Sequence, residues 1–123
     1  MKITRFEDIK SWQQARELTQ DIYRHTGQEK FSRDYGLKDQ LQRASASIMH
    51  NIAEGFDGGS AAEFVRFLGY AQRSATEVMS GLYIALDQSY LTAEDFESLY
   101  AKAQDTHALI GGFIRYLKTA PRP

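Results

Sequence analysis

The stretch RASASIMHNIAEG, from Arg43 to Gly55, brings together side chains that could do chemistry. It holds an arginine, serine hydroxyls, an asparagine and a glutamate, where a plain amphipathic helix would show one apolar stripe and one polar face. Such a set suits a catalytic site, a contact site for a ligand or nucleic acid, or a polar network between helices. Each use requires a different spacing of partners.

A metal site is not expected. His50 and Glu54 are four residues apart and would share one helix face, but structural and catalytic metal sites need at least three protein ligands. The di-iron pattern of helical bundles needs Glu-x-x-His pairs. None of His25, His50 and His107 has a glutamate three positions before it, so we predict no metal and no cofactor.

Nucleophilic catalysis also lacks its usual signals. The chain has no Gly-x-Ser-x-Gly sequence and no cysteine. The glycine-rich run GFDGG at 55–59 lacks the Gly-Lys-Ser/Thr ending of a phosphate-binding loop and is typical of a turn between helices. We therefore expect no enzymatic activity and find no evident small-molecule substrate.

The elements that would position these residues are helices. Apolar residues recur at spacings of three and four, and the prolines lie only at Pro121 and Pro123. Capping sequences begin at Thr4, Ser60 and Thr92. The pattern predicts a single domain spanning 1–123, an all-α antiparallel up-down four-helix bundle with helices near 7–26, 34–54, 60–89 and 93–118.

A second, polar stripe lies beside the apolar stripe of the second predicted helix, and a similar stripe flanks that of the third. Because a short loop joins the two helices, the stripes should face each other. We predict a polar network that sets their register, with Arg43 paired first with Glu77 and second with Glu63. A ligand or nucleic-acid contact is the alternative. The network comprises Arg43, Ser47, Asn51, Glu54, Glu63, Ser74 and Glu77.

Apolar and small residues also extend beyond the stripes that a monomeric bundle needs. An apolar surface of this kind favours self-association, because soluble monomers rarely leave one in water. Gly111-Gly112, inside the fourth predicted helix, indicates a close helix crossing or a bend. The predicted oligomer interface comprises Ala46, Met49, Ala53, Val65, Tyr83 and Ile84.

The charges are balanced and well mixed. Fifteen Lys and Arg against sixteen Asp and Glu give a net charge of −1, without a basic block. A broad electrostatic footprint for nucleic acid is therefore not visible, although folding could still assemble a local patch. The chain shows no signal peptide and no apolar run long enough to cross a membrane. We expect a cytoplasmic protein.

The segment LKDQLQRASASIMHNIAEGFDGGSAAEFVRFLGYAQRSATEV, residues 37–78, resembles the signature of the proteins encoded within 23S rRNA intervening sequences. The resemblance extends to Phe6 and Trp12 near the start and to the run SYL at 89–91, where the family often has Gly-Tyr-Leu. Phe31 is followed by Ser32, where the family usually has proline. The signature positions are Leu37, Gln40, Arg43 to Ser45, Ser47, Ile48, Asn51 to Gly55, Glu63, Phe64, Phe67, Leu68, Ser74 and Glu77.

The resemblance implies a four-helix bundle that assembles as a ring-shaped homopentamer without enzymatic activity. It also implies a relationship to the accessory protein of diversity-generating retroelements, which binds nucleic acid and a reverse transcriptase and is more basic than this chain. Our first hypothesis is a non-enzymatic oligomeric scaffold or interaction module. The alternative is a ring-shaped homo-oligomer that binds structured RNA or DNA.

Overall fold

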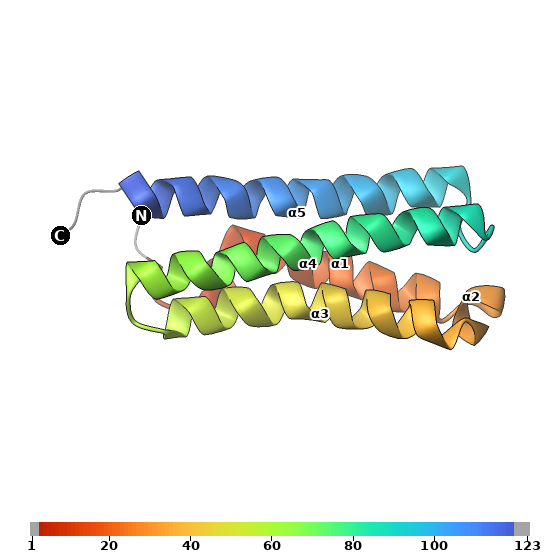
Figure 1. The fold of residues 1–123 in the computed structure, drawn as a ribbon, viewed down its shortest axis with the longest axis horizontal. Helices are drawn as coiled ribbons and strands as arrows, with labels where there is room; N and C mark the ends of the chain where they lie inside the picture. The colour runs from red at the N-terminus through yellow and green to blue at the C-terminus, as the bar shows by residue number, and fades with distance from the viewer. Residues whose placement is uncertain (1–2, 120–123) are drawn as a thin grey trace.

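The computed structural model describes residues 3–119, which are all-helical and contain no strand (Figure 1). Figure 1 shows the long helices lying side by side, each running opposite to the one before it. The predicted antiparallel four-helix bundle is confirmed. Its elements are η1 (Phe6–Asp8, a 3₁₀ turn), α1 (Lys10–Thr26), α2 (Glu29–Arg33), α3 (Tyr35–Asp57), α4 (Ala61–Asp87) and α5 (Ala93–Thr119).

The helix starts agree only in part with the predicted caps. Ser60 Oγ accepts a hydrogen bond from the backbone N–H of Glu63 at 3.1 Å, and Thr92 Oγ1 accepts one from Asp95 at 3.0 Å. The predicted cap at Thr4 is wrong, because the chain first forms η1 and α1 then begins at Lys10 without a side-chain cap. The connection before α3 contains the short helix α2, which lies between the predicted helices 7–26 and 34–54.

The core lies between the four long helices. α1 contacts α3 and α5, and α4 contacts the same two helices, so α1 and α4 lie diagonally across the bundle. The stripes predicted for α3 and α4 are buried along their whole length. Each fully buried leucine or isoleucine contributes about 1.5–3 kcal/mol relative to an exposed one. The fully buried large aliphatic side chains include Leu18, Ile22, Leu41, Ile48, Ile52, Leu68, Leu82 and Ile110.

Gly111, in the predicted glycine pair, lies at the contact between α4 and α5. A methyl group at Gly111 would lie 2.9 Å from the side-chain amide nitrogen of Gln72 on α4. That nitrogen donates a hydrogen bond to the carbonyl oxygen of His107 at 3.2 Å. The space beside Gly111 is therefore occupied by the end of the Gln72 side chain, and the choice between a close helix crossing and a bend stays a prediction.

The loop between α4 and α5 is tied to the start of α3. The ring of Tyr90 stacks on that of Phe31, with centroids 5.1 Å apart, and the Tyr90 hydroxyl donates a hydrogen bond to Asp34 Oδ2 at 3.0 Å. This hydrogen bond raises the pKa of Tyr90. Ser89, just before it, has a φ of 63°, in the left-handed region that glycine occupies most readily. A glycine at position 89 would adopt this conformation without strain.

An ion pair joins the first and last long helices. Lys102 Nζ on α5 lies 2.7 Å from Asp21 Oδ2 and 3.7 Å from Glu17 Oε1, both on α1. Partial burial acts to raise the pKa of Asp21, but the hydrogen bonds from Lys102 and Arg24 outweigh it, so the pKa lies below its ordinary value of 3.8. The pair therefore stabilises the fold only while Asp21 is ionised.

The expected result of Lys102→Met is a loss of about 1–2 kcal/mol of unfolding free energy at neutral pH, between the values for exposed and buried pairs. Because the folded pKa of Asp21 is depressed, its contribution is present above the unfolded pKa and disappears as pH falls through the folded pKa. The wild type and the variant should converge in acid. Thermal unfolding between pH 7 and pH 2 measures this, and Lys118→Met, on the same helix, is the control. If the difference in stability between the wild type and Lys102→Met were the same at all pH values, the role of Asp21 would be contradicted.

Among residues 3–119, no helix combines the length and the apolar composition that crossing a membrane requires.

Candidate functional site: a polar seam and an exposed aromatic patch

The predicted polar network is represented by a smaller seam between α3 and α4. Ser74 Oγ on α4 donates a hydrogen bond to Ser47 Oγ on α3 at 3.0 Å. Asn51 Nδ2 donates to the same oxygen at 3.0 Å and to the carbonyl oxygen of Ser47 at 2.9 Å. The structure thus brings Ser47, Asn51 and Ser74 together in a half-buried cluster at the helix contact.

Glycines bring the two helices close on either side of this cluster. A methyl group at Gly55 of α3 would lie 2.8 Å from Cβ of Phe67 and 3.0 Å from Cδ1 of Phe64 on α4. A methyl group at Gly81 of α4 would lie 2.8 Å from Leu41 Cδ2 on α3. The polar seam therefore consists of a hydroxyl contact flanked by a close approach to the α4 backbone at Gly55 and by the Leu41 side chain packed against Gly81.

The predicted pairing of Arg43 with Glu77 or Glu63 is wrong. Arg43 Nε lies 2.9 Å from Asp39 Oδ2, one turn back on the same helix, and both side chains are largely exposed. At about 100° per residue, Arg43 lies farther around α3 from the core than Ser47 or Asn51. It therefore faces solvent, where the local i,i+4 partner is the nearest carboxylate.

The acidic members of the predicted network are also separate from the seam. Glu63 pairs with Arg66 at 2.7 Å on α4, and this contact, together with the Tyr70 hydroxyl, raises the pKa of Arg66. Glu77 is exposed and accepts a hydrogen bond from Gln40 Nε2 at 3.5 Å. Glu54 is exposed on α3.

The geometry of the polar seam suits a structural contact that fixes how α3 and α4 align along their lengths. Among the described residues, the Ser74 hydroxyl donates to Ser47 Oγ, which also accepts from Asn51, and neither hydroxyl bonds to a histidine or carboxylate that could act as a base. Within residues 3–119, no three His, Cys, Asp or Glu side chains gather in a way that could hold a metal ion. The arrangement provides half-buried hydrogen bonds that favour one alignment of α3 with α4.

The predicted interface residues differ in exposure. Met49 packs against the core, and Ala46, Ala53 and Val65 are half-buried. Tyr83 and Ile84, at the end of α4, are 50% and 45% exposed. These two carry the largest exposed apolar surface of the predicted set.

Tyr83 belongs to an aromatic cluster that the sequence reading did not identify. Its ring centroid lies 4.9 Å from that of Phe96 and 5.4 Å from that of Tyr100, both on α5. We define the aromatic patch as Tyr83, Ile84, Phe96 and Tyr100. An antiparallel alignment of α4 with α5 about the 88–92 loop would have predicted it, because Tyr83 and Phe96 are nearly equidistant from that loop and Tyr100 lies one helical turn beyond Phe96.

The fold and the polar seam define a class of protein: an antiparallel four-helix bundle in which small and polar residues lie at the contact between α3 and α4. Residues 7–112 match the family model of the 23S rRNA-intervening sequence protein, and the chain belongs to this family. The chain is also similar in fold to the crystal structure of a protein of unknown function from the S23 ribosomal protein family of Bacteroides thetaiotaomicron. That similarity has a TM-score of 0.78 and 24% sequence identity over 85% of this chain and 98% of the other. No curated protein matches the chain.

Proposed function

We propose that the protein is a non-enzymatic, cytosolic interaction module that acts as a homo-oligomer. The observation that carries the proposal is the aromatic patch, in which Tyr83 is 50% exposed beside Phe96 and Tyr100, and the next residue along the chain, Ile84, is 45% exposed. Clusters of exposed aromatic side chains are characteristic of protein interfaces.

The opposing surface in this proposal is the outer face of α3. Ala46 and Ala53 are half-buried and carry only methyl groups, so a bulky side chain from a neighbouring copy can approach the helix closely. A patch on α4 and α5 that meets a different surface on α3 is a heterologous interface, which closes into a ring when the rotation between copies allows it. The family resemblance implies a ring of five.

The mass of the purified full chain in solution tests the proposal. Light scattering coupled to gel filtration should give about five times the chain mass of 14.0 kDa, held constant on dilution through the micromolar range. A mass of one chain throughout that range would overturn the proposal.

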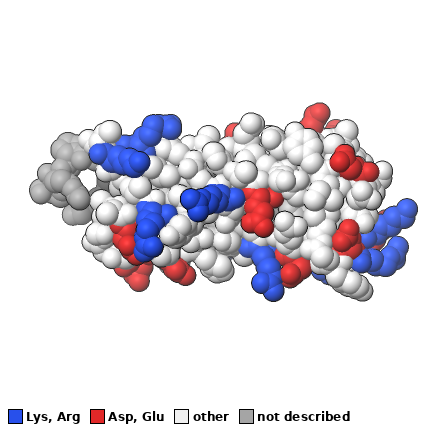
Figure 2. Space-filling model, viewed as in Figure 1, with Lys and Arg blue, Asp and Glu red and all other residues white. Residues whose placement is uncertain are grey.

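A second candidate function, binding of structured RNA or DNA, is supported by one charge feature. Arg115 and Lys118 lie in the last turns of α5, beside the first half of α4, which carries Arg66 and Arg73. Among the described residues, Arg73, Arg115 and Lys118 are not within ion-pair distance of a carboxylate. Figure 2 shows that lysine and arginine otherwise alternate with acidic side chains over the visible face.

Binding of a labelled RNA hairpin at two salt concentrations tests this second function. Neutralising several phosphates should make the affinity fall by at least tenfold between about 50 and 200 mM salt. Arg73→Gln combined with Arg115→Gln should weaken binding and flatten this salt dependence. Lys30→Gln, at the opposite end of the bundle, is the control. Absence of binding at micromolar protein in low salt would exclude the function.

A further inference from the structure

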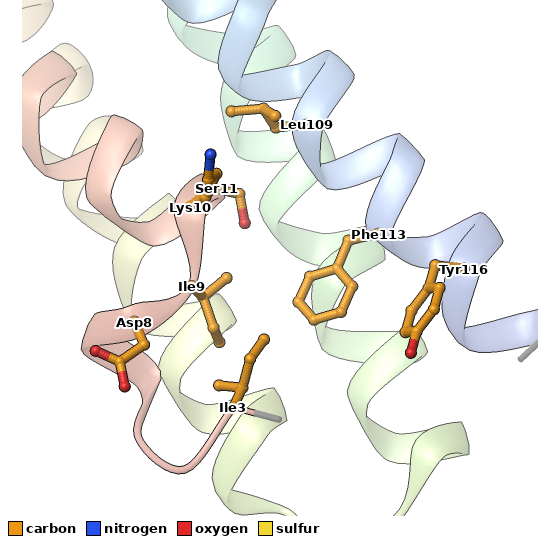
Figure 3. A pocket seen from close by; sticks show the side chains of 8 residues that line it. All are labelled: Ile3, Asp8, Ile9, Lys10, Ser11, Leu109, Phe113 and Tyr116. Carbon is orange, nitrogen blue, oxygen red and sulfur yellow. The ribbon is translucent and has the colours of Figure 1, made fainter. Parts of the chain in front are cut away.

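A cavity of about 310 Å³ lies where the start of α1 meets the end of α5. Its walls are mainly apolar side chains from two parts of the chain: Ile3 and Ile9 before α1, and Leu109 and Phe113 on α5. Figure 3 shows these side chains surrounding a common space. The volume is at the lower end of the range for small-molecule sites.

Of the polar residues that line this cavity, Asp8, Lys10 and Tyr116 are exposed, and the buried one is Ser11. The residue is only 2% exposed, and its Oγ has no hydrogen-bond partner among the described residues. Figure 3 shows the hydroxyl directed toward the space between Ile9 and Phe113. A buried hydroxyl without a partner is unfavourable for folding and is rare, so it indicates a group that would bond to something entering the cavity.

The first turn of α1 adds further donors beside Ser11. The N-cap, Ile9, supplies no side-chain hydrogen bond, and the turn contains no acidic residue. The first backbone N–H groups of a helix have no intrahelical acceptor, and the helix dipole favours an acceptor or a negative charge there. The Asp8 carboxylate, although part of the lining, turns away from the space between Ile9 and Phe113 in Figure 3.

We infer that this cavity binds a small organic carboxylate with an aromatic or branched aliphatic body. The body lies against Ile3, Ile9, Leu109 and Phe113, and the carboxylate accepts hydrogen bonds from Ser11 Oγ and from the first turn of α1. The site is at the opposite end of the bundle from the aromatic patch (Figure 1), so the two can act independently.

The test uses 3-phenylpropionate as the probe and the full chain labelled with nitrogen-15. Titration should shift the amide signals of Ser11, Leu109 and Phe113 in a saturable way, while those of Tyr83 and Ile84 stay fixed. The alcohol 3-phenylpropan-1-ol has the same body without the charge and should bind at least about tenfold more weakly. Equal affinity for the alcohol would overturn the assignment of a carboxylate.

Ser11→Ala removes the hydroxyl and leaves the apolar walls unchanged. The variant should fold at least as stably as the wild type, because the lost hydroxyl has no partner, and should bind the probe about tenfold more weakly. Ser98→Ala, at an exposed position on α5, is the matched control and should bind as the wild type does. Leu109→Trp should fill the cavity and abolish the shifts. Unchanged binding in both Ser11→Ala and Leu109→Trp, or no shift in the wild type at millimolar probe, would overturn the inference.

Discussion

Replacing Gly55 with alanine is expected to lower the free energy of unfolding by about 1–3 kcal/mol, the cost of an extra methylene in a well-packed contact. The new methyl group would lie 2.8 Å from Phe67 Cβ, which is fixed to the α4 backbone and cannot rotate away. The carbonyl oxygen of Phe64, at 3.3 Å, is equally fixed. The two helices would have to separate, which also weakens the hydroxyl contact between Ser47 and Ser74.

Gly69 is the matched control for this prediction. It lies inside α4, and a methyl group there would have no heavy atom within 4 Å. Gly69→Ala should therefore stabilise the protein by up to about 1 kcal/mol, the difference in helix propensity. Urea unfolding followed by circular dichroism measures both variants. If Gly55→Ala were as stable as the wild type, the close approach of α3 and α4 at this position would be wrong.

Replacing Ile84 with lysine is expected to reduce the solution mass from that of the oligomer to that of a single chain. Ile84 is 45% exposed and lies outside the core, so the substitution should leave the monomer folded. In the proposed interface, the lysine ammonium would be buried against a neighbouring copy without a partner, which is strongly unfavourable. Light scattering gives the mass, and circular dichroism verifies the fold.

Two further variants separate a specific interface from a general effect of charge. Tyr35→Lys changes a more exposed aromatic residue, 74% exposed at the start of α3, and should leave the mass unchanged. Ala46→Arg places a bulky charge on the proposed opposing surface of α3 and should give single chains, as Ile84→Lys does. Oligomers that persist in both Ile84→Lys and Ala46→Arg would place the interface elsewhere.

The buried core could be predicted because its apolar residues recur periodically along the sequence. Ile48 and Leu68 lie in uninterrupted runs of three-and-four spacing, and such runs leave little choice of buried face. The short helix α2 was not predictable in this way, since five residues are too few to show a period. Its position depends on Phe31, which is buried against Tyr90 from a distant loop.

The errors at the candidate site have a similar origin. A capping sequence at Thr4 favours a helix start, but Ile9 is buried in an extended conformation and Phe6 packs on Trp12, so α1 starts later. Arg43 belongs to the polar stripe of α3, but only the members of that stripe that face α4, Ser47 and Asn51, take part in the seam. The burial of Ser11 depends on side chains of α5 almost a hundred residues away, and no local pattern reports it.

The hairpin of α3 and α4 has a consequence for the order of folding. Its two helices share the most extensive contact in the bundle and are joined by only Gly58, Gly59 and Ser60. Closing so short a connection costs little chain entropy, whereas docking α1 against α5 requires contacts such as that of Asp21 with Lys102, 81 residues apart. We expect the hairpin to act as the folding nucleus and its backbone amides to exchange slowest with deuterated solvent, with α1 the first long helix to detach.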